Sequence, residues 1–170
     1  MKQVIVQGTP LRVWYEVVLE AERASNILLP EDSEHYLVTL LMRYTNQPHF
    51  ATHAMGFAYL ESLAQLPHNM HCLLRDVGDQ CLLLAGFFPK YAQRRRVSER
   101  YFLELGKMAY DQLALSEKNV TTALYQELVF YFESMTCILQ ALRSFSNMED
   151  KKPYDIYTKW KNSGQKRHQH

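Results

Sequence analysis

Apolar residues recur every three or four positions over most of this chain, which is the period of an amphipathic α-helix. In the first such stretch, Leu11, Trp14 and Val18 fall on one helical face. The last stretch is the most regular, because its apolar residues from Leu124 to Leu142 are four, three, four, three and four positions apart. The pattern predicts helices at about 10–24, 31–45, 50–65, 70–87, 98–113 and 119–145.

Capping and breaking residues indicate where these helices begin and end. Thr9 followed by Pro10 is typical of a helix start, since threonine caps the first amides and proline is tolerated at the first helical position. Ser98 is a second predicted cap, and Pro48 is a predicted stop. The stretch 66–69 is predicted to interrupt the helical pattern, and residues 2–7 are predicted to form a short extended lead.

Two glycines inside the predicted fourth helix need an explanation of their own. Gly78 and Gly86 each cost a helix about 1 kcal/mol relative to alanine. They therefore predict a point of tight packing, a kink or an interruption in that helix.

The arrangement as a whole predicts an all-α fold: a single-domain bundle of about six helices with a short extended N-terminal lead. A length of 170 residues is ordinary for one domain. Glycine and proline, with six residues each, are too few for the many turns of a β-sandwich. We expect residues 1–148 to form the helical domain and residues 149–170 to form a flexible tail.

Charge is distributed unevenly between these two regions. Residues 151–170 hold six Lys and Arg against one acid, whereas residues 1–150 hold 13 Lys and Arg against 17 acids. The body is therefore mildly acidic and the tail is basic. A basic tail can contact nucleic acid, anionic lipid or an acidic protein face, or it can simply aid solubility.

Several features favour a soluble protein of the cytoplasm. Cys72, Cys81 and Cys137 stand in apolar surroundings without a CxxC pair, which is typical of buried, reduced thiols. The first ten residues lack the apolar stretch of a signal peptide. The longest apolar run, 81–88, is far shorter than the roughly 20 residues that span a bilayer, so we expect no membrane span.

The sequence contains no complete catalytic motif, because it has neither GxSxG, nor HExxH, nor a glycine-rich phosphate loop. Histidine pairs occur at His49 and His53 and at His68 and His71, but they lack the further ligands of a zinc or di-iron site. We therefore predict no catalytic residue, no metal ligand and no cofactor, and the sequence favours a protein that is not an enzyme.

The segment 75–110 combines features of a core with features of a binding site. Arg75 and Asp79 are four residues apart, so they share a helix face beside the apolar run. If that helix is buried, both side chains need hydrogen-bond partners, and Tyr101 and Tyr110 are plausible suppliers. The resulting cluster either lines a pocket or serves as a structural network.

Three consecutive arginines, Arg94, Arg95 and Arg96, form the strongest charge feature outside the tail. Arginine binds phosphate or carboxylate through paired hydrogen bonds. Three neighbouring residues cannot all point in one direction, so at least one is expected to pack or pair internally. The triplet is either a solvated turn with internal ion pairs or a contact for an anion, a partner protein or, less in keeping with the acidic body, nucleic acid.

The same segment resembles a pattern in a bacterial family of all-helical hypothetical proteins. Members carry an arginine before Gly-Asp, an apolar stretch that ends in GLFP or GFFP, basic residues, and a helix of the form YY-x-x-x-G-x-x-AY. The resemblance implies an α-helical fold and no particular reaction, and Phe102 departs from the second tyrosine of the pattern. The matching residues are Arg75, Gly78, Asp79, Gly86, Phe87, Phe88, Pro89, Tyr101, Gly106, Ala109 and Tyr110.

These observations leave three hypotheses for function. The first is a non-enzymatic cytosolic protein that binds a partner protein as a regulator or adaptor, or that forms a homodimer. The second is a small-molecule-binding protein or enzyme with a polar pocket between the helices around Asp79 and Tyr110. The third is electrostatic binding of nucleic acid through the arginines and the tail. Eleven tyrosines, which suit interfaces, favour the first.

Overall fold

The structure is a computed structural model, and it describes residues 9–45, 55–98, 100–116 and 120–145 together with Thr158. This part of the chain is helical and contains no strand, which confirms the predicted all-α class. The helices are α1 (Pro10–Ser25), α2 (Glu31–Thr45), α3 (Met55–Leu63), α4 (Pro67–Phe87), α5 (Pro89–Arg94), α6 (Tyr101–Ser116), α7 (Val120–Phe130) and α8 (Phe132–Phe145).

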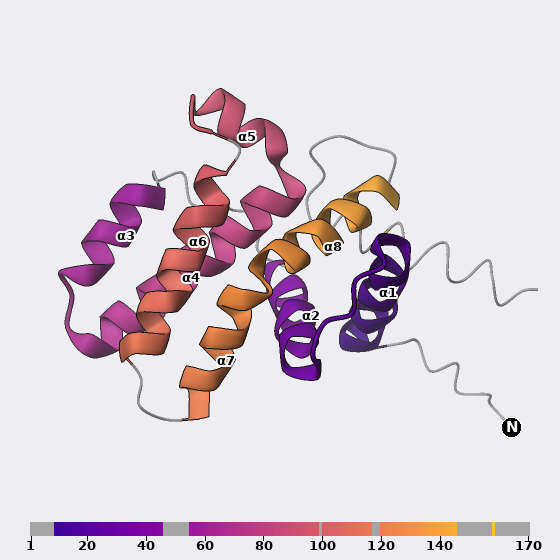
Figure 1. The fold of residues 1–170 in the computed structure, drawn as a ribbon, viewed down its shortest axis with the longest axis horizontal. Coiled ribbons are helices and arrows are strands. Elements are labelled where there is room, and N and C mark those ends of the chain that lie inside the picture. The colour runs from indigo at the N-terminus through magenta and orange to yellow at the C-terminus, as the bar shows by residue number, and fades with distance from the viewer. Residues whose placement is uncertain (1–8, 46–54, 99, 117–119, 146–157, 159–170) are drawn as a thin grey trace, which may run out of the picture.

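The predicted count of about six helices is wrong for two local reasons. The stretch after Pro89 forms the short helix α5, where the sequence indicates only a connecting segment. The single helix predicted for 119–145 is divided at Tyr131 into α7 and α8. Hydrogen bonds of 2.9 Å from Tyr131 to Glu127 and from Met135 to Tyr131 continue across the division, where the chain changes direction (Figure 1). The predicted extended lead and, apart from Thr158, the predicted tail lie outside the described residues.

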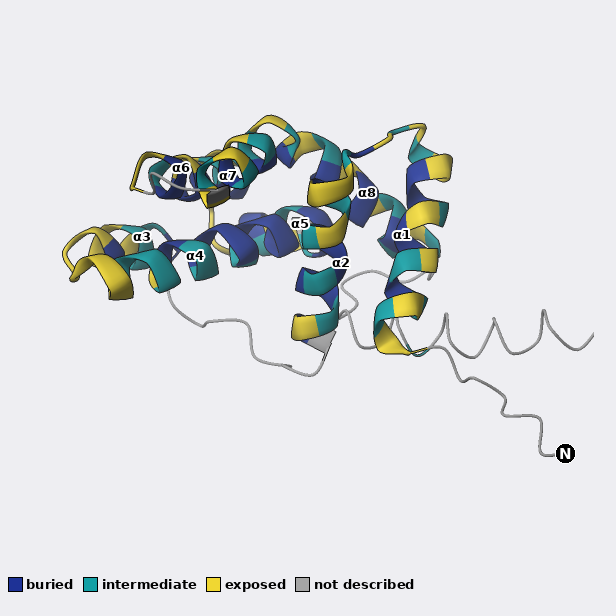
Figure 2. Cartoon of the chain, turned by 90° about the horizontal axis from the view of Figure 1, so that it is seen from below, coloured by how far each residue is buried: buried dark blue, intermediate teal, exposed yellow. Residues whose placement is uncertain are grey.

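Helix α4 has the most central position in the bundle. It packs along α6 and also contacts α3, α5 and α8, while α1 packs against α2 and α8. Figure 1 shows α3, α4 and α6 at one end of the molecule and α1 at the other. The buried faces of the helices turn toward one another and the exposed faces turn outward (Figure 2). Trp14, Leu37, Leu83 and Phe132 therefore belong to one hydrophobic core.

The helix starts agree with the capping residues in some places and differ in others. Thr9 Oγ1 accepts a hydrogen bond from the Arg12 amide at 3.4 Å, which confirms the predicted cap of α1. Pro67 is the first residue of α4, although the sequence predicts a break at 66–69. Proline fits there because an amide of the first turn has no acceptor inside the helix. Helix α6 begins at Tyr101, three residues after Ser98.

Two acidic side chains join α1 to α2. Glu22 is only 4% exposed, and its Oε1 atom accepts a hydrogen bond from the Leu29 amide at 3.1 Å. Glu34 is hydrogen-bonded to Glu22, and its pKa is raised by burial and then by the negative charge of Glu22. A hydrogen bond between two carboxyl groups requires a proton on one of them, so this joint is sensitive to protonation.

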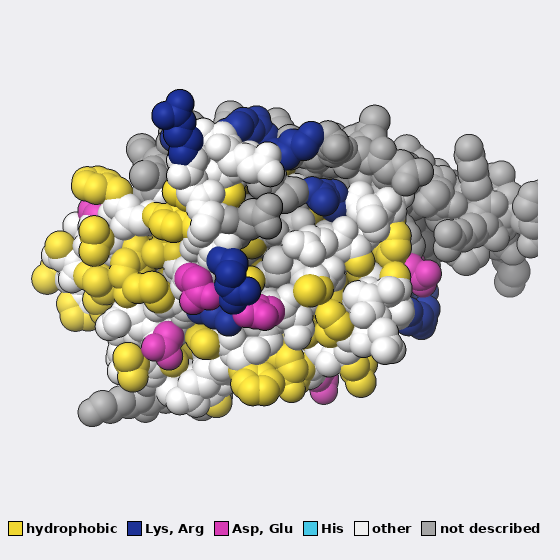
Figure 3. Space-filling view, turned by 45° about the horizontal axis from the view of Figure 1, so that its top comes forward, with side chains coloured by type: hydrophobic (Ala, Val, Ile, Leu, Met, Phe, Trp, Pro, Cys, Tyr) yellow, Lys and Arg dark blue, Asp and Glu magenta, His cyan; other side chains and the backbone are white. Residues whose placement is uncertain are grey.

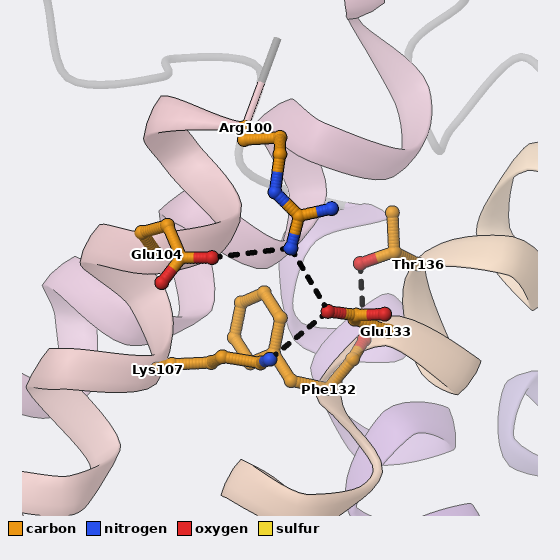
Figure 4. A network of polar contacts seen from close by, with 6 residues as sticks. All are labelled: Arg100, Glu104, Lys107, Phe132, Glu133 and Thr136. Carbon is orange, nitrogen blue, oxygen red and sulfur yellow. Dashed lines mark hydrogen bonds and ion pairs between the residues drawn. The ribbon is translucent and has the colours of Figure 1, made fainter. Parts of the chain in front are cut away.

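An exposed ion-pair network joins the start of α6 to α8 (Figure 4). Arg100 Nη2 lies 3.2 Å from both Glu104 Oε1 and Glu133 Oε1, and Lys107 Nζ lies 3.1 Å from Glu133 Oε1. Lys107, followed by Arg100, lowers the pKa of Glu133. Because solvent screens exposed pairs, the network contributes little to stability compared with the core.

The three cysteines differ in their burial. Cys81 is buried, and burial raises the pKa of its thiol, whereas Cys72 is half-buried and Cys137 is exposed. The prediction of a buried thiol is therefore wrong for Cys137. Helix α8 buries Thr136 and Ile138 on either side of it, and Cys137 falls on the outward face between them.

Candidate functional site

Asp79, in the middle of α4, is a carboxylate with no solvent exposure. The hydroxyl groups of Tyr36 and Tyr110 donate hydrogen bonds to its Oδ1 atom at 2.5 and 2.6 Å. Arg43 Nη2 donates to Oδ2 at 2.5 Å and forms an ion pair with it. These four residues, which we call the Asp79 cluster, connect α2, α4 and α6 in the core.

Helix geometry explains how the donors reach one carboxylate. Tyr36 and Arg43 are seven residues apart on α2, so they lie on one face, two turns from each other. Gly78 makes room for Tyr110, because a Cβ atom at this position would lie only 2.6 Å from Cδ1 of the Tyr110 ring. Helix α4 continues without interruption through Gly78. Of the three explanations predicted for this glycine, the structure therefore confirms tight packing.

Burial dominates the electrostatics of the cluster. It raises the pKa of Asp79, while the hydroxyls of Tyr110 and Tyr36 and the charge of Arg43 act in the opposite direction. Burial, followed by the charge of Asp79, raises the pKa of Tyr110 and of Tyr36. Both phenols therefore remain protonated donors at neutral pH. The arrangement suits a structural network, because it contains no deprotonated nucleophile and no uncommitted base.

The structure brings together only part of the cluster that the sequence predicts. Asp79 and Tyr110 do meet, but the ion-pair partner of Asp79 is Arg43 and not Arg75. Arg75 still lowers the pKa of Asp79 by its charge, although its buried Nε atom has no hydrogen-bond partner in the described part of the chain. Tyr101 lies elsewhere: its hydroxyl abuts Gly56 of α3.

Sequence reasoning missed Tyr36 and Arg43, which supply two of the three contacts to Asp79. A signal for them exists in the sequence, since both are polar-tipped residues two helical turns apart beside the apolar stripe of α2. That spacing cannot reveal which other helix they face. Arg43 is also the route by which the cluster reaches solvent, because 38% of its side chain is exposed.

The arginine triplet lies apart from the Asp79 cluster, at the end of α5. Arg94, Arg95 and Arg96 are all exposed, and Figure 3 shows basic side chains on this side of the molecule. Arg95 Nε donates a hydrogen bond to the Tyr91 hydroxyl at 3.1 Å, and its guanidinium lies 5.2 Å from the centre of the Tyr91 ring. The prediction that at least one arginine pairs internally is confirmed for Arg95.

A cavity of about 420 Å³ lies between α2 and α7, next to the Asp79 cluster. Tyr36 belongs to both, since it lines the cavity and its hydroxyl donates a hydrogen bond to Asp79. Other lining residues are Asp32, His35, Thr39, Leu124 and Glu127.

The outward face of α3 is unusually apolar for a helix at the surface. Phe57 is 68% exposed, Leu60 65% and Leu63 40%, and Leu66, just beyond the helix, is 75% exposed. We call these four residues the α3 face. Figure 3 shows hydrophobic side chains gathered at this end of the molecule. The inward face of α3 holds the buried residues Met55 and Ser62.

Neither the features of the described ranges nor similarity to known proteins assigns the chain to a family. In the described ranges, no three His, Cys, Asp or Glu side chains come together in a group able to hold a metal ion; His49 and His53 lie outside these ranges. None of the described helices combines the length and the apolar character needed to cross a membrane. No protein-family model matches the chain, and no curated protein or solved structure is significantly similar to it.

Proposed function

We propose that this chain is a non-enzymatic cytosolic helical protein that binds a partner protein, of the regulator or adaptor type, through the α3 face. The observation that carries the proposal is the exposure of Phe57, Leu60 and Leu66, each at least 65% accessible. A helix that is apolar on all sides is normally buried on all sides. Within the described part of the chain, α3 is covered on one side only, so a partner would cover the other.

The chemistry of the α3 face indicates what kind of partner fits. Phe57, Leu60 and Leu63 recur every three residues, so their side chains follow one another along the helix. Contiguous apolar surface of this kind is typical of protein–protein contacts. The partner would present an apolar helix face, and a second copy of this chain, with its own α3 face, meets that description.

The test is a charged double variant, Phe57→Glu with Leu60→Glu, compared with Leu28→Glu and Phe130→Glu as a matched control. Leu28 and Phe130 are 83% and 78% exposed and lie away from α3. Light scattering measures self-association, and affinity capture followed by reconstitution with the purified partner measures hetero-association. The α3 variant should lose the complex at an unchanged melting temperature, while the control keeps it. A chain that is monomeric and binds no reconstituted partner would overturn the proposal, as would equal behaviour of the two variants.

We also propose that the chain belongs to the bacterial family whose sequence pattern it resembles. Several residues that carry it meet in space: Gly78 packs against the ring of Tyr110, and Tyr110 donates to Asp79. A sequence pattern that encodes one packing contact would persist in proteins that share this helix pair. Solved structures of family members with α4 and α6 packed differently would argue against membership.

A small-molecule function is the second candidate. A pocket at Asp79 and Tyr110 themselves is less favoured, because both side chains have no exposure and bind each other. The observation in favour is the cavity beside Tyr36. Nucleic-acid binding through Arg94–Arg96 and the tail is a third candidate, supported by the exposure of all three arginines, and it requires binding that weakens steeply with salt.

A further inference from the structure

The cavity between α2 and α7 has the size and the mixed lining of a small-ligand site. Its volume of about 420 Å³ is within the roughly 300–1,000 Å³ of typical ligand pockets. Its lining is partly apolar, with Tyr36 and Leu124, and partly acidic, with Asp32 and Glu127. The site is distinct from the α3 face, and it is the cavity that favours the small-molecule candidate described above.

The charge of the cavity is one-sided. Asp32 and Glu127 come from different helices, and no lysine or arginine is among the described residues that line it. Neither carboxylate takes part in an ion pair in the described part of the chain. The remaining titratable side chains at the cavity are His35, which is hydrogen-bonded to the Tyr15 hydroxyl, and Tyr36. A cationic ligand would therefore meet attraction without a competing lysine or arginine among the described lining residues.

The positions of two lining side chains are set by contacts behind them. The buried Ser33 hydroxyl donates to Glu127 Oε2 at 2.6 Å, which orients the carboxylate and leaves Oε1 to accept from a ligand. The hydroxyl of Tyr36 donates to Asp79 at 2.5 Å, so this aromatic side chain is held in place. An aromatic side chain fixed beside carboxylates is the combination that binds ammonium groups by charge and by cation–π attraction.

We propose that the α2–α7 cavity binds an organic ammonium group carried on a small apolar or aromatic body. The ammonium would donate to Glu127 and Asp32, and the apolar body would pack on Tyr36 and Leu124. The proposal rests on the cavity and its fixed walls together, and it does not depend on the α3 face.

The test uses phenethylamine as the probe and 2-phenylethanol as its neutral counterpart of nearly equal shape. Titration into the ¹⁵N-labelled full chain should shift the amide resonances of α2 and α7, with the amine binding about tenfold or more tightly than the alcohol. The variants Glu127→Gln and Asp32→Asn should each weaken amine binding by about tenfold and leave alcohol binding unchanged.

Both cavity variants should keep the fold, and a third variant serves as the control. Glu127→Gln retains an oxygen acceptor for Ser33, and Asp32 is an exposed residue of the first turn of α2. Asp111→Asn, an exposed carboxylate on α6, should bind the amine as the unaltered chain does. Equal affinity for amine and alcohol, shifts confined to other helices, no shift at millimolar amine, or unchanged binding in both cavity variants would overturn the proposal.

Discussion

At the scale of single residues, Asp79 shows how a charge can be kept in an apolar core. A buried carboxylate loses its hydration, and only donors placed around it compensate for that loss. Tyr36, Tyr110 and Arg43 supply these donors from two other helices. The cluster therefore favours one mutual arrangement of α2, α4 and α6 over others in which the carboxylate would be unpaired.

Removing one phenolic hydroxyl from the cluster should destabilise the protein. Tyr110→Phe is expected to lower the free energy of unfolding by about 1.5–3 kcal/mol, because a buried acceptor loses a hydrogen bond to a charged group. Tyr36→Phe should act in the same direction, and the double variant should differ from the sum by at least about 0.5 kcal/mol, since both share Oδ1. Urea unfolding measures all three.

The matched control is Tyr101→Phe, whose hydroxyl lies against Gly56 outside the cluster. It should change the free energy of unfolding by no more than about 0.5 kcal/mol. If Tyr101→Phe cost as much as Tyr110→Phe, the separation of Tyr101 from the cluster would be contradicted.

At the scale of helices, the joint between α1 and α2 should respond to pH. The pKa of Glu34 is raised above its ordinary value of 4.5, so the folded state holds a proton that the unfolded state releases. The contribution of this proton to stability is complete below the ordinary pKa and is lost as the pH rises through the folded-state pKa. Glu34→Gln, which donates to Glu22 at every pH, should remove this decline.

The measurement is the free energy of unfolding of Glu34→Gln as a function of pH, starting near 4.5. At neutral pH the variant should be more stable than the unaltered chain by a few tenths to about 1 kcal/mol, the usual range for one net hydrogen bond. Glu61→Gln, an exposed carboxylate on α3, should reproduce the pH profile of the unaltered chain. If Glu34→Gln were less stable than the unaltered chain at neutral pH, the sharing of a proton between Glu34 and Glu22 would be refuted.

Gly78 allows a sharper test of the packing between α4 and α6. Helix propensity alone predicts that Gly78→Ala stabilises α4 by about 1 kcal/mol. The new Cβ atom would overlap the ring of Tyr110, which is fully buried and hydrogen-bonded. We expect a net loss of about 1–3 kcal/mol, typical of overpacking. Thermal unfolding measures it, and Asn69→Ala, exposed on the same helix, should be neutral or slightly stabilising.

At the scale of the whole molecule, the core that the structure describes extends from α1 to α8. Its first and last fully buried apolar residues are Trp14 and Leu142. If residues 149–170 form the separate tail that the sequence predicts, a chain that ends at Met148 should melt within about 2 °C of the full chain, equivalent to roughly 0.5 kcal/mol at this size. Calorimetry measures the difference. A drop much larger than this would show that the region 149–170 belongs to the domain and is not a separate tail.

Much of the fold could be predicted because helix formation follows a local pattern. The stripe Trp14 and Val18 and the stripe Leu128 and Leu142 are both buried as their spacing predicts. The division of the last helix could not be predicted from its unbroken spacing. The bend at Tyr131 allows α7 to pack on α6 while α8 packs on α4 and α1, and these neighbours come from distant segments.

The candidate site was only partly predictable, for a related reason. Most of the helices, their apolar faces and the polar Asp79 within a buried run could be predicted from the sequence alone, since all of these depend on near neighbours. Tertiary packing sets the pairing of Asp79 with Arg43 and not Arg75, the place of Tyr101 outside the cluster, and the outward direction of the apolar side chains of α3. Those outcomes depend on how the helices are oriented against one another, and spacing along one helix carries no information about that.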